Sequence, residues 1–315
     1  MYKGLTKIPT VNMPRKEWLE HRRKSIGGSD AAAVVGLNRY ASPYSLWADK
    51  RGLLPEKEDT EAMRIGRDLE DYVAQRFTEA TGKRVRRENS IIVNPSIPFA
   101  HANVDRLVVG EDAGLECKTT TVLNLKRYAN GEYPEHYYVQ CVHYMMVTGA
   151  ARWYLAVLVM GQGFYWFCIE RDEAEIEALQ TAEVAFWRDV ENGTPPPVDG
   201  LTATSEAVSA VLGGSTPGVK CDITAYADDM DEYFSIKQSI KALETRKDEI
   251  ENRIKVYMDD AEAGESDRYF ISYAEQNRRT FDVNRFAGDH PELDLNDYYK
   301  TSKTRTFRAK IKKGA

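Results

Sequence analysis

Apolar residues recur every three or four positions through the first part of the chain, which is the spacing of helices with one buried face. Helices are predicted over residues 14–24, 42–52 and 59–81, and residues 25–37 predict a Gly-Gly turn, a capping Ser-Asp pair and a short Ala/Val-rich helix. Pro14 and Pro43 suit a first helical turn, and Ser42 suits the capping position before Pro43. Gly82 is a typical helix stop, so the longest of these four helices is expected to end there.

The pattern changes after Gly82, where short runs rich in β-branched residues are bounded by Pro or Gly. Strands are predicted over residues 83–95, 99–110 and 113–121. A helix, a two-stranded hairpin and a second helix are predicted to follow, over residues 134–150, 151–171 and 172–193. Strands that alternate with helices in this way indicate an α/β fold.

A Pro-rich stretch, TPPPVDG over residues 194–200, is the best candidate for a domain boundary. It divides the chain into two predicted domains, residues 1–199 and residues 200–315. Residues 201–218 are small and polar, which predicts a connector, and residues 269–286 have a strand–turn–strand pattern.

A long helix is predicted between these two segments, over residues 228–261. Seven of its residues fall on alternating steps of three and four, broken only by Lys247: Tyr233, Ile236, Ile240, Leu243, Ile250, Ile254 and Tyr257. This spacing is typical of a coiled-coil seam. The pattern leaves open whether the seam pairs with a helix of this chain, with a second subunit, or with the surface of the first domain.

Composition describes an ordinary globular protein, with 315 residues of which 42% are hydrophobic and 29% charged. No apolar run approaches the ~18 residues of a membrane span, and the start lacks an apolar signal region, so a cytoplasmic protein is expected. A net charge of −6 argues mildly against a nucleic-acid partner, which would then depend on local basic segments such as residues 301–315. The four cysteines form no C-x-x-C pair, which favours reduced thiols over a zinc or iron–sulfur site.

The stretch GLECKTTT, residues 114–121, carries the candidate chemistry. In a strand, Glu116 and Lys118 project from the same face, because side chains alternate with a period of two. An antiparallel turn around residues 110–113 would bring Asp105 of the preceding run close to Glu116. Two carboxylates and the carbonyl between Glu116 and Lys118 form an oxygen site that suits Mg²⁺ or Mn²⁺. A lysine beside such an ion can act on a water or on a phosphate, so these parts predict metal-assisted phosphodiester hydrolysis.

Asp105, Glu116 and Lys118 alone would also fit an exposed strand with an ordinary cross-strand pair. Further features are needed to choose between that interpretation and a metal site. Glu70, on the long helix before the strands, is placed to add a third carboxylate. Gln140 and Tyr144 lie one turn apart on the helix that follows the strands. Arg22 and Ser29 flank a Gly-Gly turn near a helix start, an arrangement suited to binding a phosphate.

These motifs occur in the order R-x(6)-S, G-x-x-x-E, V-D, G-L-E-C-K-T and Q-C-x-x-Y-M-x-x-T-G. In this order they resemble the YqaJ-type viral recombinase nucleases, relatives of the phage lambda exonuclease in the PD-(D/E)XK nuclease superfamily. The resemblance covers residues 18–187. It implies a restriction-endonuclease-like α/β core, a mixed central sheet flanked by helices, with a C-terminal long helix and a small β appendage.

The resemblance also implies roles for the residues of the candidate metal site. Asp105 and Glu116 would be the core metal ligands, with the backbone carbonyl of Cys117 beside them. Glu70 would complete a site for two Mg²⁺ or Mn²⁺ ions. Lys118 would be the catalytic lysine.

Further roles are implied for residues around that site. Gln140 would support the lysine or the substrate, and Arg22 and Ser29 would bind the 5′-phosphate of a DNA end. Arg106 departs from the family pattern, in which a small residue often follows the aspartate, so phosphate contacts near it are expected to differ.

The implied activity is 5′-to-3′ digestion of one strand at double-stranded DNA ends, leaving 3′ overhangs for a single-strand annealing protein. Some members form a ring of three subunits, and the implied location is the cytoplasm of a bacterial host, with a phage or prophage origin. Two other functions stay open: an endonuclease of restriction or junction-resolving type, and a non-catalytic DNA-binding module. Arg22 and Ser29 favour the exonuclease, because a site that cuts within a strand needs no grip on an end.

Overall fold

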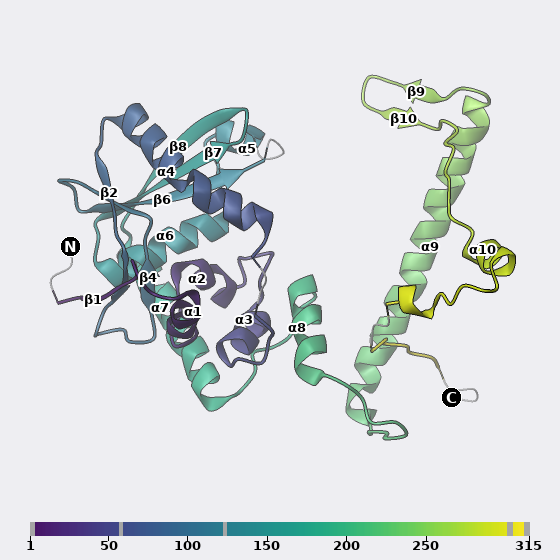
Figure 1. Ribbon diagram of the computed structural model, residues 1–315, viewed down its shortest axis with the longest axis horizontal. Coiled ribbons are helices and arrows are strands. Elements are labelled where there is room, and N and C mark those ends of the chain that lie inside the picture. Colours follow the sequence, from purple (N-terminus) through teal and green to yellow (C-terminus); the bar gives the residue numbers. More distant parts are fainter. Residues whose placement is uncertain (1–3, 57–58, 122–124, 301–304, 312–315) are drawn as a thin grey trace. The chain divides into compact units, whose positions relative to one another are not determined.

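In the computed structural model, which describes residues 4–56, 59–121, 125–300 and 305–311, a five-stranded sheet forms the centre of the first part of the chain (Figure 1). Its strands lie in the order β2 (Val85–Arg87), β5 (Arg106–Val108), β6 (Ala113–Thr120), β7 (Arg152–Val159) and β8 (Gly163–Glu170). β6 and β7 run parallel and the other neighbours run antiparallel, so the sheet is mixed.

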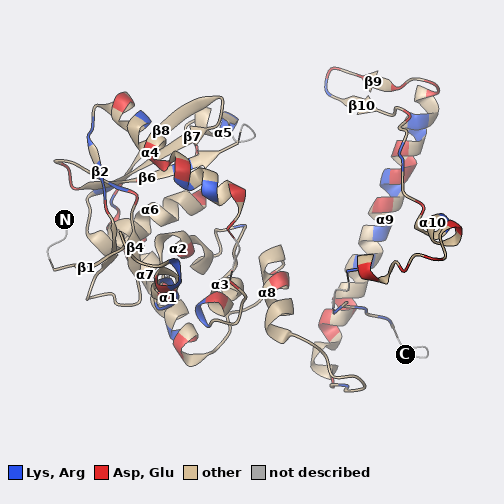
Figure 2. Ribbon diagram, viewed as in Figure 1, with Lys and Arg blue, Asp and Glu red and all other residues tan. Residues whose placement is uncertain are grey.

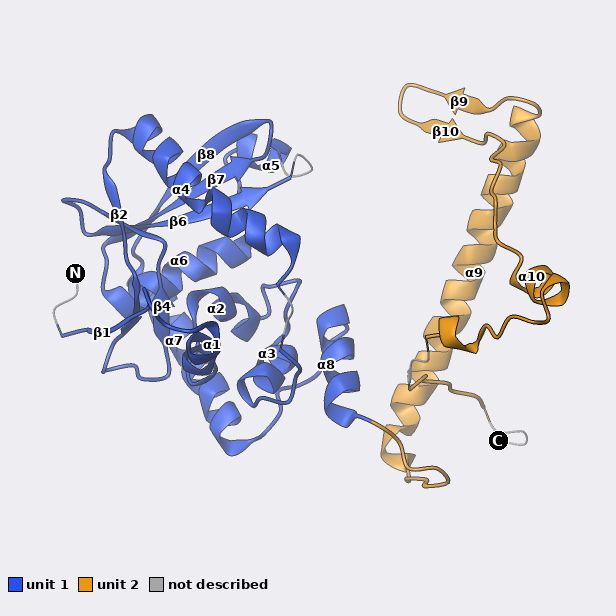
Figure 3. Ribbon diagram, viewed as in Figure 1, with its two compact units in different colours: residues 1–213 blue, residues 214–315 orange. Residues whose placement is uncertain are grey.

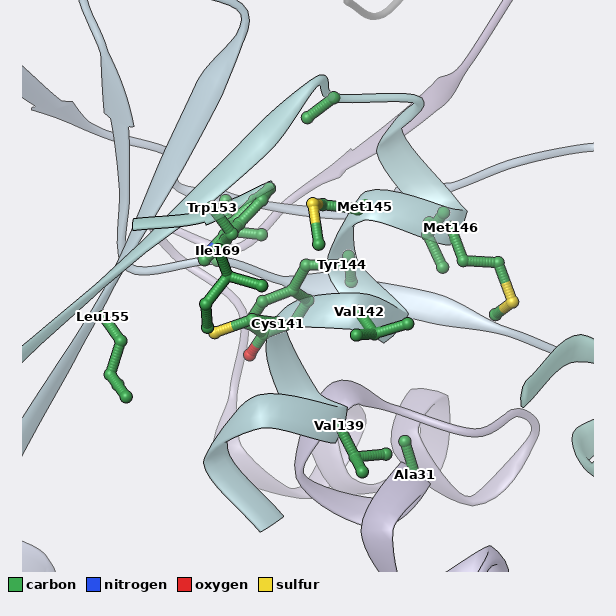
Figure 4. Close-up of a cluster of buried hydrophobic side chains, with 14 of the residues drawn as sticks. Ala31, Val139, Cys141, Val142, Tyr144, Met145, Met146, Trp153, Leu155 and Ile169 are labelled. Carbon is green, nitrogen blue, oxygen red and sulfur yellow. The ribbon is translucent and has the colours of Figure 1, made fainter. Parts of the chain in front are cut away.

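A crossover connects the two parallel strands, and it contains α5 (Leu125–Ala129) and α6 (Glu135–Thr148). Every residue of α6 from Val139 to Thr148 is buried. Its apolar side chains pack with Trp153 and Leu155 of β7 in the largest cluster of the core (Figure 4). This helix and the β7–β8 hairpin confirm two of the elements predicted from the pattern.

A second, smaller sheet contains β1 (Thr6–Pro9), β3 (Ser90–Val93) and β4 (His101–Asn103), all antiparallel. The runs predicted as single strands over residues 83–95 and 99–110 are therefore each divided between the two sheets. The alternating pattern predicts extended backbone but not the strand with which it pairs, so the change of sheet was missed. One such change, after Asn103, places Asp105 immediately before β5.

Helices cover both faces of the large sheet. The five predicted for this region are α1 (Arg15–Arg23), α2 (Gly28–Val34), α3 (Pro43–Lys50), α4 (Glu61–Thr81) and α7 (Glu173–Asn192). α4 begins at Thr60, whose side chain caps the first turn, and ends at Gly82, where φ is 70°. Phe77 of α4 packs against Leu115 of β6, on the face opposite the one that α6 covers (Figure 1).

One further helix, α8 (Thr202–Leu212), occupies the segment predicted as a connector, so that prediction was wrong. Its small residues make a weak apolar stripe, but they let α8 approach α3 closely, and Ala207 is buried there. Contacts divide the chain into two compact units, Met1–Gly213 and Gly214–Ala315, called here the first and second units (Figure 3). This division falls after α8, later than the boundary predicted at residue 199.

The second unit is built around one long helix. Its elements are η2 (Thr224–Tyr226), α9 (Ala227–Met258), β9 (Ala263–Glu265), β10 (Phe270–Ser272), α10 (Val283–Asp289) and η3 (Asn296–Tyr298). α9 confirms the predicted long helix. The strand–turn–strand prediction over residues 269–286 was wrong, because β10 pairs with the upstream strand β9 and Asp282 caps the start of α10.

Little of the second unit is buried, and Met258 is the one buried side chain among its described residues. Basic and acidic residues are interspersed along α9 (Figure 2). Of the basic C-terminal segment, residues 301–304 and 312–315 lie outside the described part of the chain. Within that part, no helix is both long and apolar enough to cross a bilayer.

Candidate active site

Asp105, Glu116 and Lys118 come together at the junction of β5 and β6. The antiparallel register pairs Arg106 with Leu115, which sets Asp105 opposite the start of the Glu116–Lys118 segment. Asp105 Oδ2 accepts a hydrogen bond from the Cys117 N–H at 2.8 Å. Lys118 Nζ lies 2.5 Å from Glu116 Oε1, as expected for two residues on one face of a strand.

A helix glutamine completes the surroundings of Glu116. Gln140 Nε2 lies 2.7 Å from Glu116 Oε1 and 2.8 Å from the Tyr144 hydroxyl, and donates to both. That hydroxyl donates in turn to the carbonyl of Asn103, 2.8 Å away. Glu116 Oε1 thus accepts bonds from two side chains, Lys118 and Gln140.

The other oxygen of this carboxylate has no partner. Glu116 is only 3% exposed, and among the described residues nothing donates a hydrogen bond to its Oε2. A buried, unpaired carboxylate oxygen is costly unless a cation or a donor binds it. Glu116 Oε2 is therefore the atom of this site most in need of a positively charged ligand.

The charges around Asp105 support the same conclusion. Burial, together with the negative charges of Glu116 and Glu70, raises the pKa of Asp105 well above its usual range. Burial alone would lower the pKa of Lys118, but the charges of Glu116 and Asp105 outweigh it and raise the pKa. Two crowded carboxylates with only oxygen donors fit Mg²⁺ or Mn²⁺, which prefer such ligands.

Glu70 does not join this group. It lies on α4 and forms an ion pair with Arg106, which also binds Asp71 at 2.7 Å and donates to the Asp105 carbonyl at 2.7 Å. Arg106 is buried and faces α4, whereas Glu116 faces α6. In the described ranges of the chain, no three His, Cys, Asp or Glu side chains are grouped so that they could hold one metal ion. Glu70 stays a predicted ligand that would have to leave Arg106 to reach the ion.

Arg22 and Ser29, predicted to bind a phosphate, lie together. Arg22 Nη2 donates to Ser29 Oγ at 2.8 Å and lies 3.1 Å from Asp30 Oδ1. Burial alone would raise the pKa of Asp30, but the charges of Lys50 and Arg22 outweigh it and hold the pKa well below its usual value. The ionised carboxylate of Asp30 thus fixes the orientation of the arginine.

Lys50 is a positioning residue that sequence reasoning missed. Its ammonium is buried, with 1% of the side chain exposed, and binds Asp30 Oδ2 at 2.7 Å. It also donates to the carbonyls of Arg22 at 2.6 Å and Ser25 at 2.8 Å, so it ties the end of α1 to the start of α2. The sequence did contain an indication that Lys50 is buried, because it lies one helical turn after the apolar Leu46 on the same face of α3.

The Gly-Gly pair between Arg22 and Ser29 is needed for close packing rather than for a turn. A Cβ on Gly28 would lie 2.5 Å from the Tyr144 ring, far closer than real contacts allow. Gly28 therefore lets α2 pack directly on Tyr144, the residue that bonds to Gln140. This contact joins the helix that carries Ser29 to the hydrogen-bonded groups around Glu116.

Two histidines near the site are held by other groups. The His101 ring lies 2.7 Å from Ser25 Oγ, and burial lowers the pKa of His101 to about 3. His143 lies 2.7 Å from Glu183 Oε1 and 2.9 Å from the His101 carbonyl, and both His143 and Glu183 are fully buried. Burial would lower the pKa of His143, but Glu183 outweighs it and raises the pKa.

Comparison with known proteins places this arrangement in a family. Residues 17–151 match the YqaJ-like viral recombinase domain. The chain is also 40% identical over 301 residues to the uncharacterized protein YqaJ of Bacillus subtilis (strain 168), an alignment that covers 94% of this chain and 93% of that protein. The chain belongs to the YqaJ-like viral recombinase family. The matched domain contains every candidate site residue from Arg22 to Gln140.

A solved structure shows the same fold. The alkaline exonuclease LHK-Exo from Laribacter hongkongensis superposes with a TM-score of 0.50 and 24% identity, covering 57% of this chain and 94% of that protein. The mixed sheet flanked by helices is thus the PD-(D/E)XK-like fold of the phage-type exonucleases, and the predicted fold class is confirmed.

Proposed function

We propose that this YqaJ-like protein is a metal-dependent deoxyribonuclease that hydrolyses phosphodiester bonds. The observation that carries the proposal is the convergence of Asp105, Glu116 and Lys118, with one buried oxygen of Glu116 left without a partner. Burying two carboxylates beside a lysine costs free energy. A protein that only binds DNA or has a structural role would gain nothing in return for that cost. The likeness in fold to an alkaline exonuclease supports the same reaction class.

The residues present fit a divalent cation, Mg²⁺ or Mn²⁺. Asp105 and Glu116 would hold it, with the carbonyl of Cys117 beside them, and Glu70 would serve a second ion. When bound, such an ion neutralises charge on the phosphate and activates a water at neutral pH. Gln140 and Lys118 both bind Oε1 of Glu116, which leaves Oε2 as the oxygen that would hold the ion.

Lys118 is expected to work on the substrate itself. Its ammonium lies beside Glu116 and 5.2 Å from the centre of the Tyr137 ring, which keeps it within the site. From this position it can donate a hydrogen bond to a phosphate oxygen or to the attacking water. Gln140 is a positioning residue, because it acts on the substrate only through Glu116.

We assign the reaction, more narrowly, to 5′-to-3′ resection of double-stranded DNA ends that leaves 3′ overhangs for a single-strand annealing protein. Arg22 and Ser29 support this, since together they offer hydrogen-bond donors for a terminal phosphate. One Arg22 nitrogen is engaged by Ser29 and Asp30, and the guanidinium has further N–H groups for a ligand. The cytoplasm of a bacterial host and a ring of three subunits are part of the same proposal.

The deciding experiment is digestion of labelled duplex DNA with Mg²⁺, with Mn²⁺ and with EDTA. Linear DNA with a 5′-phosphate should be degraded fastest, linear DNA with a 5′-hydroxyl more slowly, and a closed circle not at all. Cutting of the circle would show an endonuclease instead. No digestion of any substrate with either metal ion would leave a non-catalytic DNA-binding module and overturn the proposal.

A further inference from the structure

Arg106 joins Glu70 to the edge of the acidic site. Its side chain is 4% exposed, and its guanidinium binds three acceptors. Nη1 binds Glu70 Oε1 and also donates to the Asp105 carbonyl at 2.7 Å, while Nη2 donates to Asp71 Oδ1 at 2.7 Å. One nitrogen of Arg106 therefore contacts both the proposed ligand of the second ion and the backbone of a proposed ligand of the first.

Glu70 lies on the face of α4 that covers the sheet. Gly66, one helical turn earlier, packs over β6, since a Cβ added to it would lie 3.7 Å from Thr119 Oγ1. Residues four apart share one face of a helix, so Glu70 points the same way. Its side chain is 28% exposed, which leaves the carboxylate accessible to an ion from solvent. Arg106 already balances the charge of that carboxylate.

We infer that Arg106 competes with the second metal ion for Glu70, so that the two ions bind in order and with unequal affinity. This inference rests on the proposed function, because it concerns the same metal site. The first ion takes Asp105 and Glu116, whose Oε2 has no other partner among the described residues. The second ion gains Glu70 only when Glu70 leaves Arg106. Breaking the pair with a buried arginine costs free energy, and this cost weakens binding of the second ion.

Asp71 makes the exchange of partners possible. When Glu70 leaves, Arg106 keeps Asp71 and the Asp105 carbonyl, so the buried guanidinium is not left without acceptors. Asp71 is held in turn by Arg87, whose Nε lies 3.1 Å from the same Oδ1 and whose Nη2 binds Oδ2. Arg106 and Asp71 thus form a lasting pair, and Glu70 is the member that can change partner.

The test counts Mn²⁺ ions bound to the full-length protein without DNA, from the electron paramagnetic resonance signal of free Mn²⁺. The wild type should bind a second ion with a Kd about 10-fold or more above that of the first. Arg106→Met keeps an unbranched side chain but removes the charge. It should lower the second Kd by about 10-fold and leave the first unchanged. Glu70→Gln should abolish the second step and so identify it.

Two further variants separate competition from damage to the fold. Asp71→Asn leaves Glu70 as the one carboxylate bound to Arg106, so the second ion should bind about threefold more weakly or worse. Damage to packing would weaken binding in Arg106→Met and Asp71→Asn alike, whereas competition moves them in opposite directions. Arg86→Met is the matched control, because Arg86 is an exposed arginine of β2 that pairs with Glu88 at 3.3 Å. It should leave both affinities unchanged.

Four results would overturn the inference while the first ion still binds. They are equal affinities for the two ions in the wild type, a second step that survives Glu70→Gln, no tightening in Arg106→Met, and an equal tightening in Arg86→Met. A wild type that binds no Mn²⁺ at all would instead contradict the metal site of the proposed function, and with it the order of binding.

Discussion

The two units of this chain differ in where they place charged and apolar side chains. The first unit buries charged groups beside partners, as Lys50 with its three acceptors and His143 with Glu183 show, and it leaves an oxygen of the buried Glu116 unpaired. The second unit keeps its charges in water, as in the pair Arg246–Glu249 at 2.8 Å, and exposes its apolar residues along α9 instead.

This difference separates two kinds of functional surface. Burying a charge costs free energy unless its partners are placed accurately, so a fold that does it repeatedly holds those groups in a defined geometry. An exposed apolar row gains nothing until something covers it. The first unit is therefore organised around buried, partnered charges, whereas the described residues of the second unit leave a row of apolar side chains exposed along α9.

The largest expected effect tests the site. Lys118→Ala or Glu116→Gln should lower the rate of DNA digestion by about 1,000-fold, because the first removes the ammonium that would act on the phosphate and the second removes the charge of a carboxylate that would hold the ion. Lys241→Ala removes an exposed lysine of α9 and is the matched control, with an expected change of less than about twofold. Release of nucleotides from end-labelled duplex measures all three rates. Full activity of Lys118→Ala would contradict the assigned role.

The next effect tests burial of charge directly. Glu183→Ala removes one member of the buried pair with His143 and should lower the free energy of unfolding by about 3 to 5 kcal/mol. Glu249→Ala breaks the exposed pair with Arg246 and should cost less than about 1 kcal/mol. Urea unfolding followed by circular dichroism compares the two variants. Equal losses would show that the contrast between the units does not extend to stability.

The smallest effect concerns pH. The His101 pKa of about 3 lies below that of an unfolded histidine, about 6.5. Below about pH 6.5 the unfolded chain takes up a proton at His101 that the folded chain does not, so stability falls as the pH is lowered. His101→Gln removes this contribution, and relative to the wild type it should gain about 1 kcal/mol between pH 7 and pH 5.5.

Unfolding midpoints in urea at the two pH values measure this gain. His290→Gln, an exposed histidine of the second unit, is the matched control. A pH dependence of His101→Gln equal to that of the wild type would mean that His101 is not held neutral by its buried position.

The parts of the molecule that were predictable from sequence are those set by local geometry. The period of two placed Glu116 and Lys118 on one face, and a short antiparallel turn brought Asp105 to them. Helices with clear caps, such as α4 between Thr60 and Gly82, ended where the pattern indicated.

What was not predicted depends on neighbours distant in sequence. Arg106 takes Glu70 out of the acidic group because α4 packs over β6, on the face to which Arg106 points, and no local pattern reports that packing. Lys50 is buried because three acceptors from elsewhere converge on it. The pattern of the small residues in α8 likewise gave no sign that α3 would cover them.

The contact between Gly28 and Tyr144 has a consequence for the proposed binding of a DNA end. The backbone next to Ser29 packs directly on the ring whose hydroxyl bonds to Gln140, so a displacement of α2 would also displace a neighbour of Glu116. A DNA end whose terminal phosphate is bound by Arg22 and Ser29 would then have a set number of nucleotides between that phosphate and Glu116. A side chain added at position 28 would push α2 away from Tyr144 and would therefore change the distance between Ser29 and Glu116.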